Sequence, residues 1–126
     1  MAREKIELEY LFRASPAILY TFFTTPSNLV RWFCDEVEIE DETYIFSWEG
    51  AEEEADLVED VQDERLRFKW VDADDDDEYL EVRFSKSEVT NQTILEITDF
   101  ADDDEVGDQK QLWENQIAKL RQETGS

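Results

Sequence analysis

The sequence predicts an α+β fold in which a curved antiparallel β-sheet wraps around one long C-terminal α-helix. Near the end of the chain, Val106, Trp113, Ile117 and Leu120 recur at spacings of seven, four and three, so they share one face of a helix. Nearly everything upstream alternates with a period of two, which is typical of strands. One helix with a narrow apolar stripe, facing that many strands, indicates a sheet that surrounds it.

The first elements are a strand and two short helices. Residues 5–13 alternate cleanly between apolar and charged side chains, so we expect a half-buried strand there. Ser15-Pro16 and Thr25-Pro26 then each place a hydroxyl N-cap directly before a proline that suits a first helical turn. These signals predict helices over about 16–23 and 26–33, with large apolar side chains that must dock against the sheet.

About six further strands precede the long helix. Apolar residues alternate with polar ones around residues 37–39, 44–48, 51–61, 66–70, 80–84 and 93–100. Gly50 is expected to break the strand or to allow a bulge. Turns recur roughly every ten residues, which is typical of an antiparallel meander. No linker divides the chain, and we predict a single domain over residues 1–126.

The charge of the chain excludes several classes of partner. Thirty-five acidic residues against 12 basic ones give a net charge of −23, which repels nucleic-acid backbones and anionic membrane surfaces. No run approaches the roughly 20 apolar residues that a membrane span needs. The N-terminus has no apolar signal core, so we expect a cytoplasmic protein without nucleic-acid partners.

The chain also lacks the residues of common catalytic and metal sites. It contains no histidine, which removes imidazole metal sites and histidine-based nucleophilic systems. Cys34 is the only cysteine, and no base near it in the sequence would activate it. The acidic runs at 52–54, 74–78 and 102–105 encode no coordination geometry. We therefore predict no metal and no cofactor, and an enzyme is not the favoured interpretation.

Several segments together resemble a known family. They are Ser15 to Pro26 followed by Leu29-Val30-Arg31-Trp32, then Phe46-Ser47-Trp48-Glu49-Gly50, Phe68-Lys69-Trp70, and Trp113 to Leu120. In this order they resemble the START-like superfamily, also called birch-pollen-allergen-like or helix-grip, and most closely its branch related to the activator of heat-shock-chaperone ATPase. The resemblance implies a sheet that grips the C-terminal helix, often with an apolar cavity between them. The chain lacks the His, Arg and Tyr sets of cyclase-type relatives, which weakens any transfer of enzymatic activity.

The leading functional hypothesis is a cavity that binds a small hydrophobic ligand, lipid-like or aromatic. Inward-facing rings and one inward acid would line it, since such pockets are concave, apolar and carry few polar groups. The predicted site residues are Tyr44, Phe46, Trp48, Phe68, Trp70, Asp99, Trp113 and Ile117. Tyr20, Trp32 and Phe33 are expected near one mouth. The competing interpretation is that these rings simply fill the core.

Two other functions stay open. The protein could be an interaction module, chaperone-related by family analogy, whose outer sheet face or acidic loops dock a protein partner; Asp74–Asp77 would then be essential. It could also be a hydrolase or cyclase that uses Asp99, which lies in phase with Leu95 and Ile97. Charged edge strands discourage pairing of two copies, but the sequence selects neither a monomer nor a homodimer.

Overall fold

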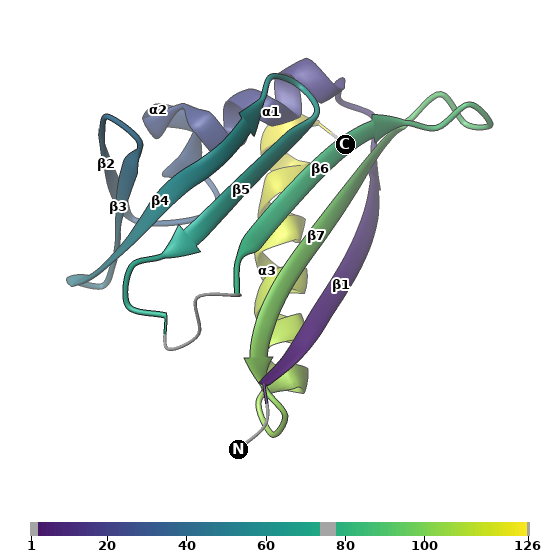
Figure 1. The fold of residues 1–126 in the computed structure, drawn as a ribbon. Helices are drawn as coiled ribbons and strands as arrows, with labels where there is room; N and C mark the ends of the chain where they lie inside the picture. The colour runs from purple at the N-terminus through teal and green to yellow at the C-terminus, as the bar shows by residue number, and fades with distance from the viewer. Residues whose placement is uncertain (1–2, 74–77, 126) are drawn as a thin grey trace.

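The computed structural model describes residues 3–73 and 78–125, within which seven strands and three helices form an α+β helix-grip fold (Figure 1). The strands are β1 (Arg3–Phe12), β2 (Glu36–Glu40), β3 (Thr43–Trp48), β4 (Ala51–Val61), β5 (Arg65–Trp70), β6 (Leu80–Lys86) and β7 (Thr93–Asp102). The helices are α1 (Pro16–Thr24), α2 (Pro26–Leu29) and α3 (Val106–Thr124). This architecture confirms the predicted curved sheet around a long C-terminal helix.

All seven strands belong to one antiparallel sheet, in the order β1-β7-β6-β5-β4-β3-β2. Strands β2 to β7 follow one another as the predicted meander, and β1 joins at the far side of β7. In Figure 1 the sheet curves around α3, which lies behind β5, β6 and β7, while α1 and α2 lie across the upper end. Among residues 3–73 and 78–125, no helix combines the length and apolarity that crossing a membrane requires.

The two short helices begin as predicted, but the second ends early. The Ser15 hydroxyl accepts a hydrogen bond from the Ile18 amide at 3.2 Å and so caps α1, whereas the Thr25 side chain makes no capping bond. Helix α2 is a single turn, because the Leu29 carbonyl accepts from three successive amides, those of residues 32 to 34. In the irregular turn that follows α2, the adjacent side chains of Trp32 and Phe33 are both buried.

Helix α3 buries three of the four side chains that the spacing predicts, while Val106 in its first turn is only half-buried. Trp113, Ile117 and Leu120 are its buried residues. The helix ends at Gly125, which has the left-handed conformation (φ 75°) and whose amide donates to the Arg121 carbonyl. The Arg121 guanidinium also donates to the Leu11 carbonyl at 2.8 Å, which fastens the last turns of the helix to the edge strand β1.

A tight turn fixes the register between β3 and β4. Glu49 and Gly50 connect the two strands, and both have positive φ angles, 50° and 87°, as a two-residue hairpin turn requires. Gly50 is therefore a turn residue rather than a bulge. The turn pairs Phe46 with Glu53 and Trp48 with Ala51, so Glu53 is on the same face of the sheet as the buried Phe46 ring.

The sheet is unevenly paired. β1 and β7 pair along their whole lengths, from Arg3–Asp102 to Phe12–Thr93. β5 and β6 pair only where Arg65–Phe68 meets Leu80–Arg83. Beyond Phe68 the end of β5 therefore has no partner in β6, and in Figure 1 the lower ends of β5 and β7 diverge.

A buried carboxylate lies on the outer face of the sheet. Glu81 is 4% exposed and binds Arg67 and Arg83, with an N–O distance of 2.7 Å to each. Burial opposes ionisation of Glu81, but hydrogen bonds from these two arginines outweigh it and hold the pKa of Glu81 below its ordinary value. The cluster lies across β5 and β6, so it reinforces the sheet where the pairing is shortest.

Candidate functional site

A groove of about 810 Å³ opens where the ends of β5 and β7 diverge. One wall is α3 from Gln109 to Lys119, and another is the loop of residues 30–35 after α2. The sheet contributes the groove ends of β3 to β5, residues 78–80 leading into β6, the end of β7 and Arg3 of β1. The volume lies in the range of small-molecule sites.

Aromatic rings form the inner end of this groove. The Phe33 ring is central: its centroid lies 5.4 Å from that of Trp48, 6.1 Å from that of Trp113 and 5.1 Å from that of Phe46. The Phe46 ring in turn lies 5.9 Å from that of Trp70. The loop after α2, the sheet and α3 thus contribute rings to one continuous apolar surface, which suits an apolar ligand.

The predicted site residues occupy three levels. Trp48, Trp70, Asp99 and Trp113 line the groove. Phe46 and Phe68 lie beneath it and border a void of only about 10 Å³, which Trp70 and Trp113 also reach. Tyr44 and Ile117 line neither space and are buried in the core, 3% and 2% exposed. The interior between sheet and helix is thus nearly filled, and the accessible space lies at its open end.

Of the three residues expected near the mouth, two line the groove and one does not. Trp32 and Phe33 line the groove. Tyr20 does not: its hydroxyl donates to Asp60 on β4 at 2.5 Å, and its ring packs edge-on against Phe84. The expectation for Tyr20 was wrong because α1 turns this side chain toward β4 and β6.

Asp99 connects the sheet to α3 at the side of the groove. It is 8% exposed and lies on the inner face of β7, as the alternation with Leu95 and Ile97 predicts. Its Oδ2 accepts hydrogen bonds from the Trp113 indole and the Gln109 amide, both at 2.9 Å. Its Oδ1 accepts from the Phe100 backbone amide at 2.8 Å. The carboxylate therefore satisfies donors that would otherwise be buried without partners.

The backbone carbonyl of Phe33 links the loop after α2 to both the sheet and α3. It accepts from Nε1 of Trp48 at 2.7 Å and from Nε2 of Gln116 at 3.2 Å, so one oxygen binds both the sheet and α3. The indoles of Trp32, Trp48 and Trp113 all donate inside the protein. Within the part of the chain that the structure describes, the Trp70 indole makes no such bond, although its ring lines the groove.

The charged groups of the groove are on different walls. Arg3 binds Glu78 at 2.6 Å and Asp102 at 3.0 Å, and these bonds raise the pKa of its guanidinium. Glu53 lines the groove from β4. Cys34 also lines it, but burial and then the charge of Asp35 raise the pKa of its thiol to about 11, which leaves it an unreactive thiol at neutral pH.

Glu53 is one of several groove residues that the sequence analysis did not predict, and it is the acid that lines the groove from β4. It lies in the acidic run of residues 52–54, where no alternation of apolar and polar residues shows which side chain faces inward. Two signals were available: the alternation of Ala55 and Leu57 farther along β4, whose phase places residue 53 on the inner face, and the turn at Glu49–Gly50, which sets the register.

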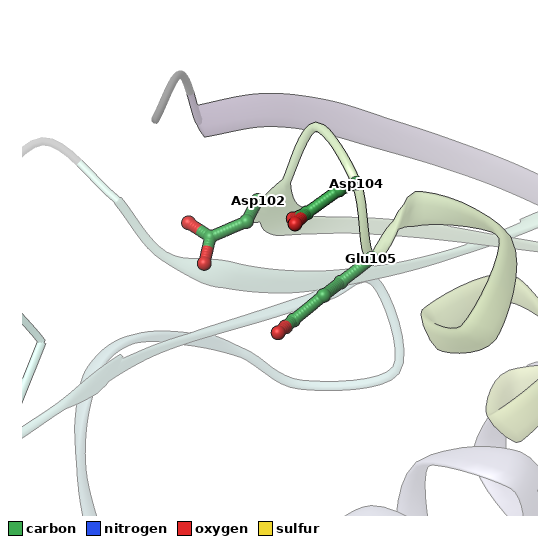
Figure 2. Close-up of side chains that lie close together, drawn as sticks. All are labelled: Asp102, Asp104 and Glu105. Carbon is green, nitrogen blue, oxygen red and sulfur yellow. The ribbon is translucent and has the colours of Figure 1, made fainter.

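One group of acids could in principle approach a metal ion. Asp102, Asp104 and Glu105, on the turn between β7 and α3, have carboxylate oxygens within 4.8 Å of one another (Figure 2). Asp102 is already paired with Arg3, while Asp104 and Glu105 are exposed. Negative charge just before a helix is favourable without any ion, because it complements the helix dipole. We therefore interpret these acids as solvent-exposed residues at the start of α3 and not as a metal site.

The fold and the groove together define the class of protein. A curved antiparallel sheet that grips a C-terminal helix, with an aromatic groove at its open end, is a helix-grip domain. The chain belongs to the START-like superfamily, whose domain matches residues 1–126. The resemblance seen in the sequence is thereby confirmed over the whole chain.

Solved structures agree with this assignment. The chain is 37% identical to BfR322 from Bacteroides fragilis, with a TM-score of 0.68, covering 97% of this chain and 91% of that one. The Aha1 dimer from Colwellia psychrerythraea is 15% identical with a TM-score of 0.81, and 96% of each chain is covered. CalU16 from Micromonospora echinospora is 20% identical with a TM-score of 0.73, covering 95% of this chain and 84% of that one. The last two show the fold alone, and no curated protein matches the chain.

Proposed function

We propose that the protein is a non-enzymatic START-like domain that binds a small hydrophobic ligand, lipid-like or aromatic, in the groove between the sheet and α3. The groove itself, about 810 Å³ with an aromatic inner end, is the observation that carries the proposal. START-like domains commonly bind hydrophobic ligands. Trp48, Trp70 and Trp113 would supply the contact surface, and Phe46, Phe68, Tyr44 and Ile117 would support it from beneath.

The polar groups of the groove favour binding over catalysis. Asp99 accepts three hydrogen bonds, two at Oδ2 from α3 and one at Oδ1 from the Phe100 amide, so Oδ1 keeps one acceptor position for a ligand. The buried Cys34 thiol stays protonated at neutral pH. In this proposal Asp99 orients the Trp113 indole and offers a polar contact to the ligand, and it transfers no proton.

A groove-filling variant tests the proposal. Ala51 lines the groove next to the turn, whereas Glu52 is the next residue on β4 and faces the opposite side of the sheet. Ala51→Phe should abolish the response of tryptophan emission and melting temperature to a panel of lipid-like and aromatic ligands. The matched variant Glu52→Phe should keep that response. Native mass spectrometry of freshly purified protein should show an added mass that disappears on denaturation.

Two outcomes would contradict the proposal. A saturating ligand panel that changes neither tryptophan emission nor melting temperature would count against any ligand site. An unchanged response in Ala51→Phe would place the ligand elsewhere.

The alternative is a protein-interaction module. It is favoured by the nearly filled interior, since the void beneath the groove measures only about 10 Å³. The acidic residues Asp74–Asp77, whose charge reversal would abolish capture of a partner on this interpretation, lie outside the described residues. Pull-down with the wild type and a reversal variant, with ligand binding measured on both, distinguishes the two functions.

A further inference from the structure

The groove carries a carboxylate in a position that suggests the charge of its ligand. Glu53 lies directly across from Phe46 in the pairing of β3 and β4, on the inner face of the sheet. The Phe46 ring is flanked by two indoles, with centroids 5.7 Å from Trp48 and 5.9 Å from Trp70. A cross-strand neighbour has its Cβ roughly 5 Å away, so the Glu53 side chain leaves the sheet beside this aromatic group, and its carboxylate is within reach of the groove.

Glu53 is not explained by the packing of the protein itself. It is exposed at the groove and forms no ion pair with any base among residues 3–73 and 78–125. Its neighbours along the same face of β4, Ala51 and Ala55, have small side chains, so the carboxylate is not crowded from its own strand. Glu53 is thus an acid on an otherwise apolar stretch of the inner face of β4, and it is available to a ligand.

The surroundings favour a cation over an anion. Aromatic rings attract positive charge through their electron-rich faces. The whole chain carries −23 charges, which raises the local concentration of cations and lowers that of anions. The basic residues that line the groove are on other walls, namely Arg3 on β1, Arg31 after α2 and Lys119 on α3. Arg3 is already bound by two carboxylates, and Arg31 lies 4.0 Å from Glu123.

We propose that the ligand of this groove is an organic cation, an apolar molecule with an ammonium end, and that Glu53 binds the ammonium beside the indoles of Trp48 and Trp70. The apolar part then lies along the rings of Phe33 and Trp113. This inference rests on the proposed function and specifies the chemical class of its ligand.

Three probes with the same eight-carbon chain separate charge from apolarity: n-octylammonium, n-octanol and n-octanoate. Binding is followed by NMR from the indole N–H signals of Trp48 and Trp70, at physiological salt so that long-range fields are screened. Octylammonium should bind roughly fivefold more tightly than octanol, and octanoate more weakly than octanol. Glu53→Gln should remove most of the preference for octylammonium, with the indoles supplying the remainder, and leave octanol binding unchanged.

Glu52→Gln is the matched control. It removes the same charge from the adjacent residue, which faces the outer side of the sheet, so the affinity for octylammonium should stay unchanged. Trp70→Leu should weaken octylammonium more than octanol, because it removes an aromatic face while retaining an apolar side chain.

The outcomes separate this inference from the function on which it rests. If octanol binds and octylammonium has no advantage, or if Glu52→Gln and Glu53→Gln have equal effects, the cationic ligand is refuted and the hydrophobic groove stands. If none of the three probes shifts the indole signals, the hydrophobic groove itself is refuted.

Discussion

Replacing Asp99 by asparagine should destabilise the domain by about 2–4 kcal/mol. The carboxylate uses one oxygen for the Trp113 indole and the Gln109 amide and the other for the Phe100 amide. Asparagine has one acceptor oxygen, so its NH₂ group must face donors on one of the two sides. Trp113 is 3% exposed and its N–H cannot turn to water instead. Each hydrogen bond to a charged group contributes about 1.5–3 kcal/mol, and an orphaned buried donor costs a similar amount.

Urea unfolding followed by far-UV circular dichroism measures this loss. Asp103→Asn, an exposed neighbour in the turn after β7, should change stability by less than about 0.5 kcal/mol. Trp113→Phe and the double variant complete a cycle in which Asp99 and Trp113 should couple by at least about 1 kcal/mol. A stability of Asp99→Asn equal to or above that of the wild type would refute the structural role. Such a result would mean that the Asp99 carboxylate lowers the stability of the fold, as expected of a catalytic group in the hydrolase or cyclase hypothesis.

Three further predictions concern other parts of the molecule. Ser15→Ala should cost about 1 kcal/mol of unfolding free energy, and Thr25→Ala less than about 0.5 kcal/mol, because only the first hydroxyl caps its helix; equal losses in urea unfolding would contradict this. The pKa of Glu81 is lower in the folded than in the unfolded protein. Glu81 therefore contributes to folding stability at pH values above its unfolded-state pKa, and this contribution is lost as the pH falls through its folded-state pKa. The stability difference between wild type and Glu81→Gln should therefore shrink on acidification, and a difference independent of pH would exclude this linkage. Cys34 should react with iodoacetamide roughly a hundredfold more slowly in the folded than in the urea-unfolded protein at about pH 8, and similar rates would show an accessible thiolate.

The sequence predicts the fold well because each signal is local. The alternation along β1 and β7, the Ser15-Pro16 cap and the apolar stripe from Val106 to Leu120 are each complete within a single element. The inward position of Asp99 follows from the same phase. The early end of α2 was not predictable, because it depends on packing two adjacent large rings, Trp32 and Phe33, against other elements.

The groove was predictable only in part. Aromatic residues on the inner face are visible in the sequence, yet whether a ring fills the core or lines an opening depends on where neighbouring strands stop pairing. Tyr44 and Phe46 share a strand and a face, but Trp48 on the same face lies at the groove. The acidic run that contains Glu53 shows no period of its own, so its inward position has to be extrapolated from the phase of Ala55 and Leu57 or from the hairpin register.

The short seam between β5 and β6 has a mechanical consequence. It divides the sheet into one plate that carries β2 to β5 and another that carries β6, β7, β1 and the attached helix α3. Few backbone pairs resist rotation at this seam, and the ion pair between Arg67 on β5 and Glu81 on β6 is a side-chain link that spans it. We expect the width of the groove to depend on the angle between these two parts of the sheet. Rotation about the seam would then accommodate ligands of different width, while each part keeps its internal structure.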